Sequence, residues 1–217
     1  MLRHVISSKA LMAVLLPASL AASGGSSCRP MTTYTGEAFG ASVNVLGIKT
    51  TISDTGTLPG NGGSLSTQLA GIDLPGVLKL GLLTESTTGG SGRTSSQSSV
   101  ANVTVTAVGI GVTASVLTSN AFAQACGGGS PSVAGGSNIA DLVVNGHSII
   151  VTGAPNQTVP LLIGSLIINE QISTVTSSFC GGSANITVNA LHLKVAGVAD
   201  VVISSSQSGV SCVPPPM

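Results

Sequence analysis

Residues 101–107 read Ala-Asn-Val-Thr-Val-Thr-Ala, and the pattern returns at residues 184–190 as Ala-Asn-Ile-Thr-Val-Asn-Ala. Apolar and polar side chains alternate in both copies, as in a strand with one buried and one solvated face. Other similar pairs occur in the same order along the chain: 41–52 with 140–151, 57–59 with 158–160, 82–85 with 167–170, and 111–126 with 197–212. Their shared order predicts a duplicated β unit.

The remaining sequence is also typical of an all-β protein. Clusters of Gly, Ser and Asn separate short alternating runs, and Asn145-Gly146 predicts a tight hairpin because both residues tolerate positive φ. Pro75 and several glycines interrupt the best helix candidate, residues 65–83, so we expect at most one helical turn there. We interpret the serine-rich residues 86–99 as an exposed loop between two strands.

These patterns predict one antiparallel β-sandwich domain over residues 34–212. It would consist of two sequence-related halves about a pseudo-twofold axis, repeat 1 at about 34–126 and repeat 2 at about 137–212. We expect little or no helix outside the first residues of the chain.

Residues 1–22 have the pattern of a signal peptide. Arg3, His4 and Lys9 precede a short apolar run at residues 11–16, and small residues follow Pro17. The run is too short to span a bilayer, which disfavours an uncleaved anchor. We expect an N-terminal segment at 23–33, a Pro-rich tail at 213–217, no transmembrane segment in the mature chain, and a secreted or cell-surface location.

The composition excludes several partners. Only 6% of residues are charged, and losing Arg3 and Lys9 with the signal peptide leaves more acidic than basic residues. Nucleic acid is therefore an implausible partner. Only 2% of residues are aromatic, with no Trp, so stacking platforms for sugars are scarce. The 42% hydrophobic content predicts an aliphatic core beneath a neutral surface rich in Ser and Thr.

Four cysteines in an exported chain indicate disulfides, with three possible connectivities. Cys126 and Cys212 end equivalent stretches of the two repeats, which favours a Cys126–Cys212 bridge and leaves Cys28 with Cys180. The alternative pairs Cys180 with Cys212 and Cys28 with Cys126. Small residues before Cys28 also partly match a bacterial lipidation site, a further possible fate for this cysteine.

Candidate chemistry is sparse. Glu85 and Glu170 occupy matching positions in the repeats, and paired carboxylates can act as acid and base in glycoside hydrolysis. A structural role for both is the simpler interpretation, either at a strand end or bonded to backbone amides. His192 lies within a predicted strand and His147 follows the Asn145-Gly146 turn. No zinc or calcium motif is present, and we predict no catalytic residue, metal or cofactor.

Five segments together resemble the choice-of-anchor P family of exported bacterial proteins: residues 34–40, 153–158, 168–171, 186–192 and 199–205 with Cys212. The resemblance covers nearly the whole chain from Tyr34 to Cys212. It implies a surface-exposed or secreted bacterial β protein with no established reaction and no catalytic residues to carry over. The ending Val-Pro-Pro-Pro-Met lacks a sorting motif, so we expect release or attachment through Cys28.

The leading hypothesis is a non-enzymatic exported protein with a structural or adhesion role at the cell surface or in the extracellular space. Its partner would be an envelope or matrix component, or a second copy joined through sheet edges. One alternative is a secreted hydrolase using Glu85, Glu170 or His192. Another is binding to ice or a polymer surface through threonine-rich faces, such as Thr104 with Thr106 and Thr174 with Thr176.

Overall fold

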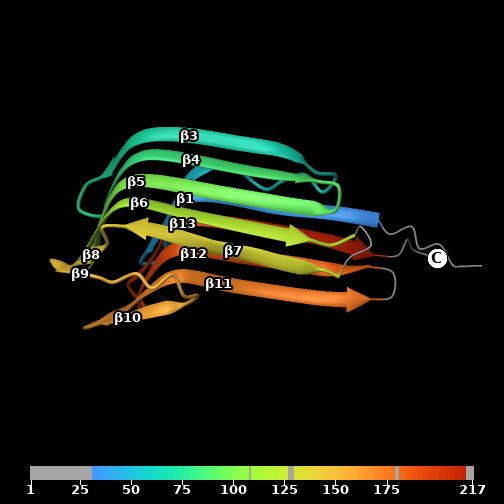
Figure 1. The fold of residues 1–217 in the computed structure, drawn as a ribbon. Coiled ribbons are helices and arrows are strands. Elements are labelled where there is room, and N and C mark those ends of the chain that lie inside the picture. The colour runs from blue at the N-terminus through green and yellow to red at the C-terminus, as the bar shows by residue number, and fades with distance from the viewer. Residues whose placement is uncertain (1–30, 108, 127–129, 179–180, 214–217) are drawn as a thin grey trace, which may run out of the picture.

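The computed structural model describes residues 31–107, 109–126, 130–178 and 181–213. Two antiparallel sheets pack face to face, and the described part of the chain contains no helix (Figure 1). Sheet A has the order β10 (Gln157–Leu161), β11 (Gly164–Ser178), β12 (Gly181–Val195), β13 (Ala199–Val213), β1 (Met31–Val45) and β2 (Ile48–Asp54). Sheet B has the order β3 (Gly63–Leu74), β4 (Leu78–Gly90), β5 (Arg93–Ala107), β6 (Ile110–Gln124), β8 (Val143–Val144) and β9 (His147–Ser148), with β7 (Ser132–Ala140) also paired to β6. The predicted all-β sandwich is confirmed.

The two similar segments quoted first lie on strands that occupy equivalent positions in opposite sheets. Residues 101–107 lie in β5 and residues 184–190 in β12, each at the centre of a three-strand meander, β4-β5-β6 or β11-β12-β13. The two halves exchange strands, because β1 pairs with β13 of the second half and β7 pairs with β6 of the first. A pseudo-twofold relation between the halves stays a prediction.

Two hairpin predictions have different outcomes. Asn145 and Gly146 have φ values of 49° and 81° and join β8 to β9, as expected for a tight turn with two left-handed residues. The interpretation of residues 86–99 as an exposed loop was wrong. They form most of the β4–β5 hairpin, and Thr87, Thr94, Ser96 and Ser98 are buried between the sheets.

A transverse crease bends the long strands, which turn together near the end of the molecule that carries β8, β9 and β10 (Figure 1). At the crease, left-handed residues occur on alternate strands of each sheet: Ser53, Asn169 and Ser204 in sheet A, and Gly71, Asn102 and Asp141 in sheet B. In β5 the buried positions are even-numbered from Thr94 to Val100 and odd-numbered from Val103 to Ala107. The crease therefore changes which residues face inward.

The largest apolar core lies on the bent side of the crease, and smaller apolar clusters, such as those around Val210 and Val188, lie on the straight side. The core on the bent side consists of aliphatic side chains from both sheets, including Leu78, Val105, Val112, Leu193 and Val201. Burial of such side chains contributes about 25 cal/mol per Å² of apolar area. This half provides the hydrophobic stabilisation that the composition predicts.

The straight side of the crease also contains a buried polar layer, the serine layer, formed by Thr87, Thr94, Ser96, Ser98, Ser119, Ser204, Ser206 and Ser208. Its hydroxyls donate to backbone carbonyls of the opposite sheet: Thr94 to Gly209 at 2.9 Å, Ser204 to Ser98 at 3.0 Å, Ser206 to Ser119 at 3.1 Å and Ser208 to Ala121 at 2.9 Å. The sheets approach so closely that a Cβ atom on Gly36 would lie 2.3 Å from the Thr87 hydroxyl. The predicted aliphatic core did not include these buried serines, which share this half with the smaller apolar clusters.

The predicted Cys126–Cys212 disulfide is confirmed, with a Cα–Cα distance of 5.7 Å. It joins the segment after β6 to β13 and thus links the two sheets at the end of the serine layer. This bridge excludes the alternative Cys180–Cys212 pairing. The proposed Cys28–Cys180 bridge, Cys28 lipidation, the signal peptide at 1–22 and the tail after residue 213 lie outside the described residues.

Candidate functional site

Two adjoining hollows of about 560 and 510 Å³ form a cleft on the outer side of sheet A. Both are lined by Asn44 and Asp200, and we call the joined region the sheet A cleft. One hollow extends over the turns near residues 46–47 and 196–198. The other extends over the strands and adds Glu37, Phe39, Ser42, Lys49, Thr187, Asn189, Val202, Ser205 and Gln207.

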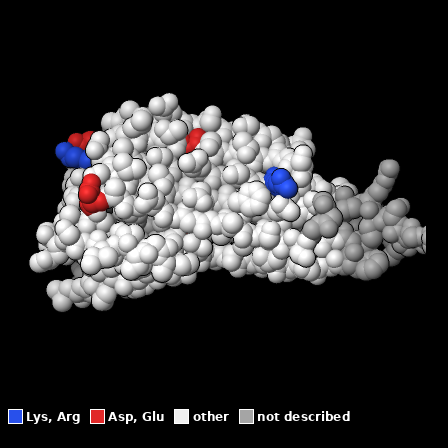
Figure 2. All heavy atoms as spheres, viewed as in Figure 1, with Lys and Arg blue, Asp and Glu red and all other residues white. Residues whose placement is uncertain are grey.

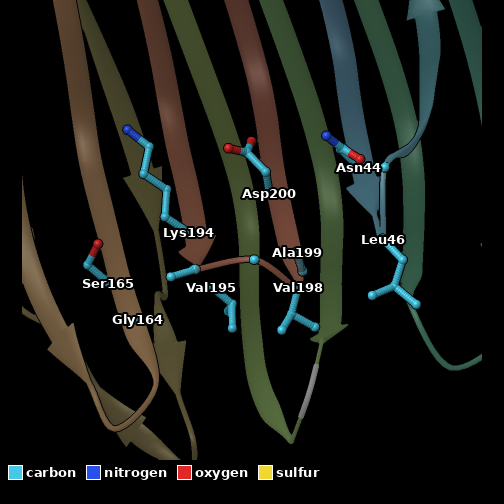
Figure 3. A pocket seen from close by; sticks show the side chains of 12 residues that line it. Asn44, Leu46, Gly164, Ser165, Lys194, Val195, Val198, Ala199 and Asp200 are labelled. Atoms are coloured by element: carbon cyan, nitrogen blue, oxygen red, sulfur yellow. The ribbon is translucent and has the colours of Figure 1, made fainter.

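The strand register sets one row of polar residues across the cleft floor. Lys194 of β12 pairs with Asp200 of β13, Asp200 with Asn44 of β1, and Asn44 with Lys49 of β2. Figure 3 shows Lys194, Asp200 and Asn44 on neighbouring strands. The Oδ1 atom of Asn44 is buried and has no hydrogen-bond partner. The row therefore offers charged and amide side chains to a ligand.

A hydrogen-bonded network lies beside this row. Nδ1 of His192 is 2.6 Å from Oε2 of Glu170, and its Nε2 is 3.0 Å from Oδ1 of Asp200. Lys194 donates to Oε1 of Glu170 at 3.0 Å, and the Asn189 amide donates to Oε2 at 2.7 Å. The predicted placement of His192 within a strand is correct, and the structure brings it together with Glu170.

The network holds Glu170 in its charged form. Burial alone would raise the pKa of this carboxyl, but hydrogen bonds from Asn189, His192 and Lys194 outweigh burial and lower the pKa below 4.5. Elsewhere in the cleft the pKa of Glu37 is raised, chiefly by burial and then by the nearby charge of Asp54. Glu170, beside the cleft, therefore holds negative charge more firmly than Glu37 within it.

This geometry suits binding better than nucleophilic catalysis. A histidine that activates a nucleophile needs one ring nitrogen facing the nucleophile and the other facing an orienting group. Both nitrogens of His192 face carboxylates instead. In the described part of the chain no group of His, Cys, Asp and Glu side chains converges to hold a metal ion.

The other predicted positions lie apart from the cleft. Glu85 is fully buried between the sheets, accepts a hydrogen bond from Ser53, and has one oxygen without a partner. Glu85 and Glu170 occupy corresponding strands, β4 and β11, yet Glu85 faces the interior and Glu170 bonds to side chains beside the cleft. Neither lies at a strand end, and the bonds described above join both to side chains. His147 is exposed in β9.

Sequence reasoning missed Asn44, Lys49, Asn189 and Asp200. Each occupies an outward position in an alternating strand, so the local sequence pattern could have predicted which side chains face outward. The sequence could not predict that these residues lie close together, because β1 pairs with β13, which is distant in the chain.

The fold and cleft define an all-β sandwich with a polar cleft on one sheet, braced by a disulfide. No described segment is a helix long and apolar enough to cross a membrane. No family model, curated protein or solved structure matches this chain. The resemblance to the choice-of-anchor P family therefore stays a prediction.

Proposed function

We propose that this protein is a non-enzymatic exported protein with a structural or adhesion role, and that it holds an envelope or matrix component in the sheet A cleft. The sheet A cleft carries the proposal, because amide, hydroxyl and charged groups line an open surface on rigid strands. Hydrogen bonds and charge would provide recognition there, since Phe39 is the cleft's one aromatic side chain.

The outer faces support a role in a crowded extracellular layer. Most outward residues on the straight part of sheet B are uncharged, among them Thr84, Ser86, Gln97, Ser99 and Asn120, and Arg93 is the charged exception. Charged side chains are sparse over the face seen in Figure 2. A neutral, hydrated face limits non-specific ionic attachment, so contact is directed to the more highly charged cleft.

Binding of the purified protein to a panel of envelope and matrix polymers tests the proposal. We expect one polymer class to bind, and Asn44→Ala to weaken that binding while Thr104→Ala, on the outer face of sheet B, leaves it unchanged. Equal binding by both variants, or no binding to cells or any polymer, would remove the support for this function.

A secreted hydrolase is the second candidate, because Glu170, His192 and Asp200 adjoin an open cleft. An esterase, glycosidase and peptidase panel distinguishes the two functions. Activity that Glu170→Gln abolishes without changing the fold would favour the enzyme. Thermal hysteresis would test ice binding by the threonine faces, and we expect none, because the exposed rows mix Ser, Gln and Asn with Thr.

A further inference from the structure

The second half of β11 is an open sheet edge. Residues 171–178 pair with β12 on one side, whereas β10 pairs only with residues 164–168. In the same region β7 forms the edge of sheet B and pairs only with β6. The Asn156 side chain bonds the backbone of Gln171, and the Gln171 side chain donates to the Gly135 carbonyl of β7. Among the described residues, the remaining edge backbone, including Ile172 to Ser178 of β11, has no strand partner on this side of the molecule.

The chemistry of this edge favours strand addition. Residues 171–178 read Gln-Ile-Ser-Thr-Val-Thr-Ser-Ser, without charge or proline. The exposed fraction is 61% for Ile172 and 44% for Val175. Exposed edge strands usually carry Lys, Pro or a bulge, which prevents pairing with another chain. None of these features occurs in this segment.

The opposite edge of sheet A is protected in the same half of the molecule. Beyond the end of β2, residues 55–60 run along β1 and include Pro59. Leu58 N donates to the Gly36 carbonyl at 2.7 Å, Thr55 N donates to Ala38 at 2.9 Å, and Tyr34 N donates to Gly60 at 3.0 Å. Only the β11 side of sheet A is therefore open along its straight half.

We propose that two copies of this chain pair antiparallel through residues 171–178 of β11. One edge used twice is self-complementary and gives a closed two-fold dimer, whereas growth into a filament through sheet A would need the protected β1 edge. Because the segment is uncharged, its two copies bring no like charges together. A two-fold axis perpendicular to the sheets also brings the β7 edges toward each other and extends both layers.

The biological role of this dimer rests on the proposed function, because the dimer would present two sheet A clefts on one body. Two linked clefts bind a repeating polymer more tightly than one, by raising the effective concentration of the second site. The pairing itself does not require a polymer and is measured on the protein alone.

Sedimentation velocity over a wide concentration range tests the pairing. We expect a monomer–dimer equilibrium, and Thr174→Lys should raise the dissociation constant about tenfold or more by placing like charges in the paired strands. Leu69→Lys, on the exposed edge strand β3, is the matched control and should leave the dimer intact. Thermal melting establishes that both variants are folded.

Hydrogen exchange adds an independent measurement, in which amides of residues 171–178 should gain protection as dimer forms. Several results would overturn the proposal: a monomer at every concentration, a dimer unaffected by Thr174→Lys, dissociation by Leu69→Lys, or open-ended growth. Protection of residues 171–178 in the monomer would show that another part of the chain covers them. Polymer binding by a Thr174→Lys monomer as tight as that by the wild-type dimer would contradict the dimer's role in polymer binding and leave the proposed function standing.

Discussion

Raising the pH through neutrality should destabilise the folded protein through one carboxyl group, that of Glu85. This side chain is fully buried between the sheets, with Leu83 and Val100 also fully buried nearby. Ser53 donates to one carboxyl oxygen, and the other has no partner. Burial raises the pKa of Glu85 from 4.5 to about 7, and the hydrogen bond from Ser53 offsets only part of that increase.

The direction follows from proton linkage. Between pH 4.5 and about 7 the folded protein holds a proton on Glu85 that the unfolded chain has lost. The stabilisation is therefore complete below the unfolded pKa and is lost as the pH rises through the folded pKa. Since one pKa unit corresponds to about 1.4 kcal/mol, the loss across this window is about 3 kcal/mol.

Urea unfolding at pH values from 4 to 8 provides the assay, with Glu85→Gln as the neutral variant. The wild type should lose about 3 kcal/mol across the window relative to Glu85→Gln. Glu37 is the other carboxyl with a raised pKa, so Glu37→Gln is the control. Its free energy of unfolding should still fall across this pH window, because Glu85 is intact. Parallel curves for wild type and Glu85→Gln would refute the reasoning, as would a carboxyl NMR titration that places Glu85 near 4.5.

Three further changes test the remaining structure by equilibrium unfolding. Cys126→Ser should cost about 4 kcal/mol, because it opens a long loop in the unfolded chain; an unchanged denaturation midpoint would contradict this. Ser206→Ala should cost about 1–2 kcal/mol by removing the donor to the Ser119 carbonyl, against less than about 0.5 kcal/mol for Gln97→Ala on the outer face; equal costs would argue against the serine layer. The pKa of Glu170 is lowered, so its stabilisation is present above pH 4.5 and lost as the pH falls through the folded pKa; Glu170→Gln should remove that acid-side decline, and a decline that persists in the variant would exclude this carboxyl as its source.

Local patterns predicted the elements well. Period-two alternation indicated β5 and β12, and Asn145-Gly146 indicated a hairpin, because both signals depend on neighbouring residues alone. The Cys126–Cys212 bridge was predictable because the repeats aligned two chain segments that meet in space. These inferences needed no knowledge of how the sheets face each other.

The crease was not predictable from the same signals. Asn102, Asn169 and Ser204 look like ordinary polar residues within strands, yet each takes a positive φ. One such residue changes which side of the strand faces inward, so every assignment of buried positions beyond it is reversed. Residues 86–99 looked solvated for another reason, their serine content, although every second side chain from Thr94 to Ser98 is buried.

The crease also explains how so polar a chain maintains two sheets. Hydrophobic burial is concentrated in the bent half, while hydroxyl-to-carbonyl bonds join the straight half. Each buried hydroxyl exchanges water for a carbonyl, so its net gain is small, but losing its partner would leave a desolvated group costing about 1–3 kcal/mol. Such bonds therefore fix how the two sheets align, while they add little to the stability of the fold. Because small side chains fill much of the space, the two sheets approach closely in the straight half.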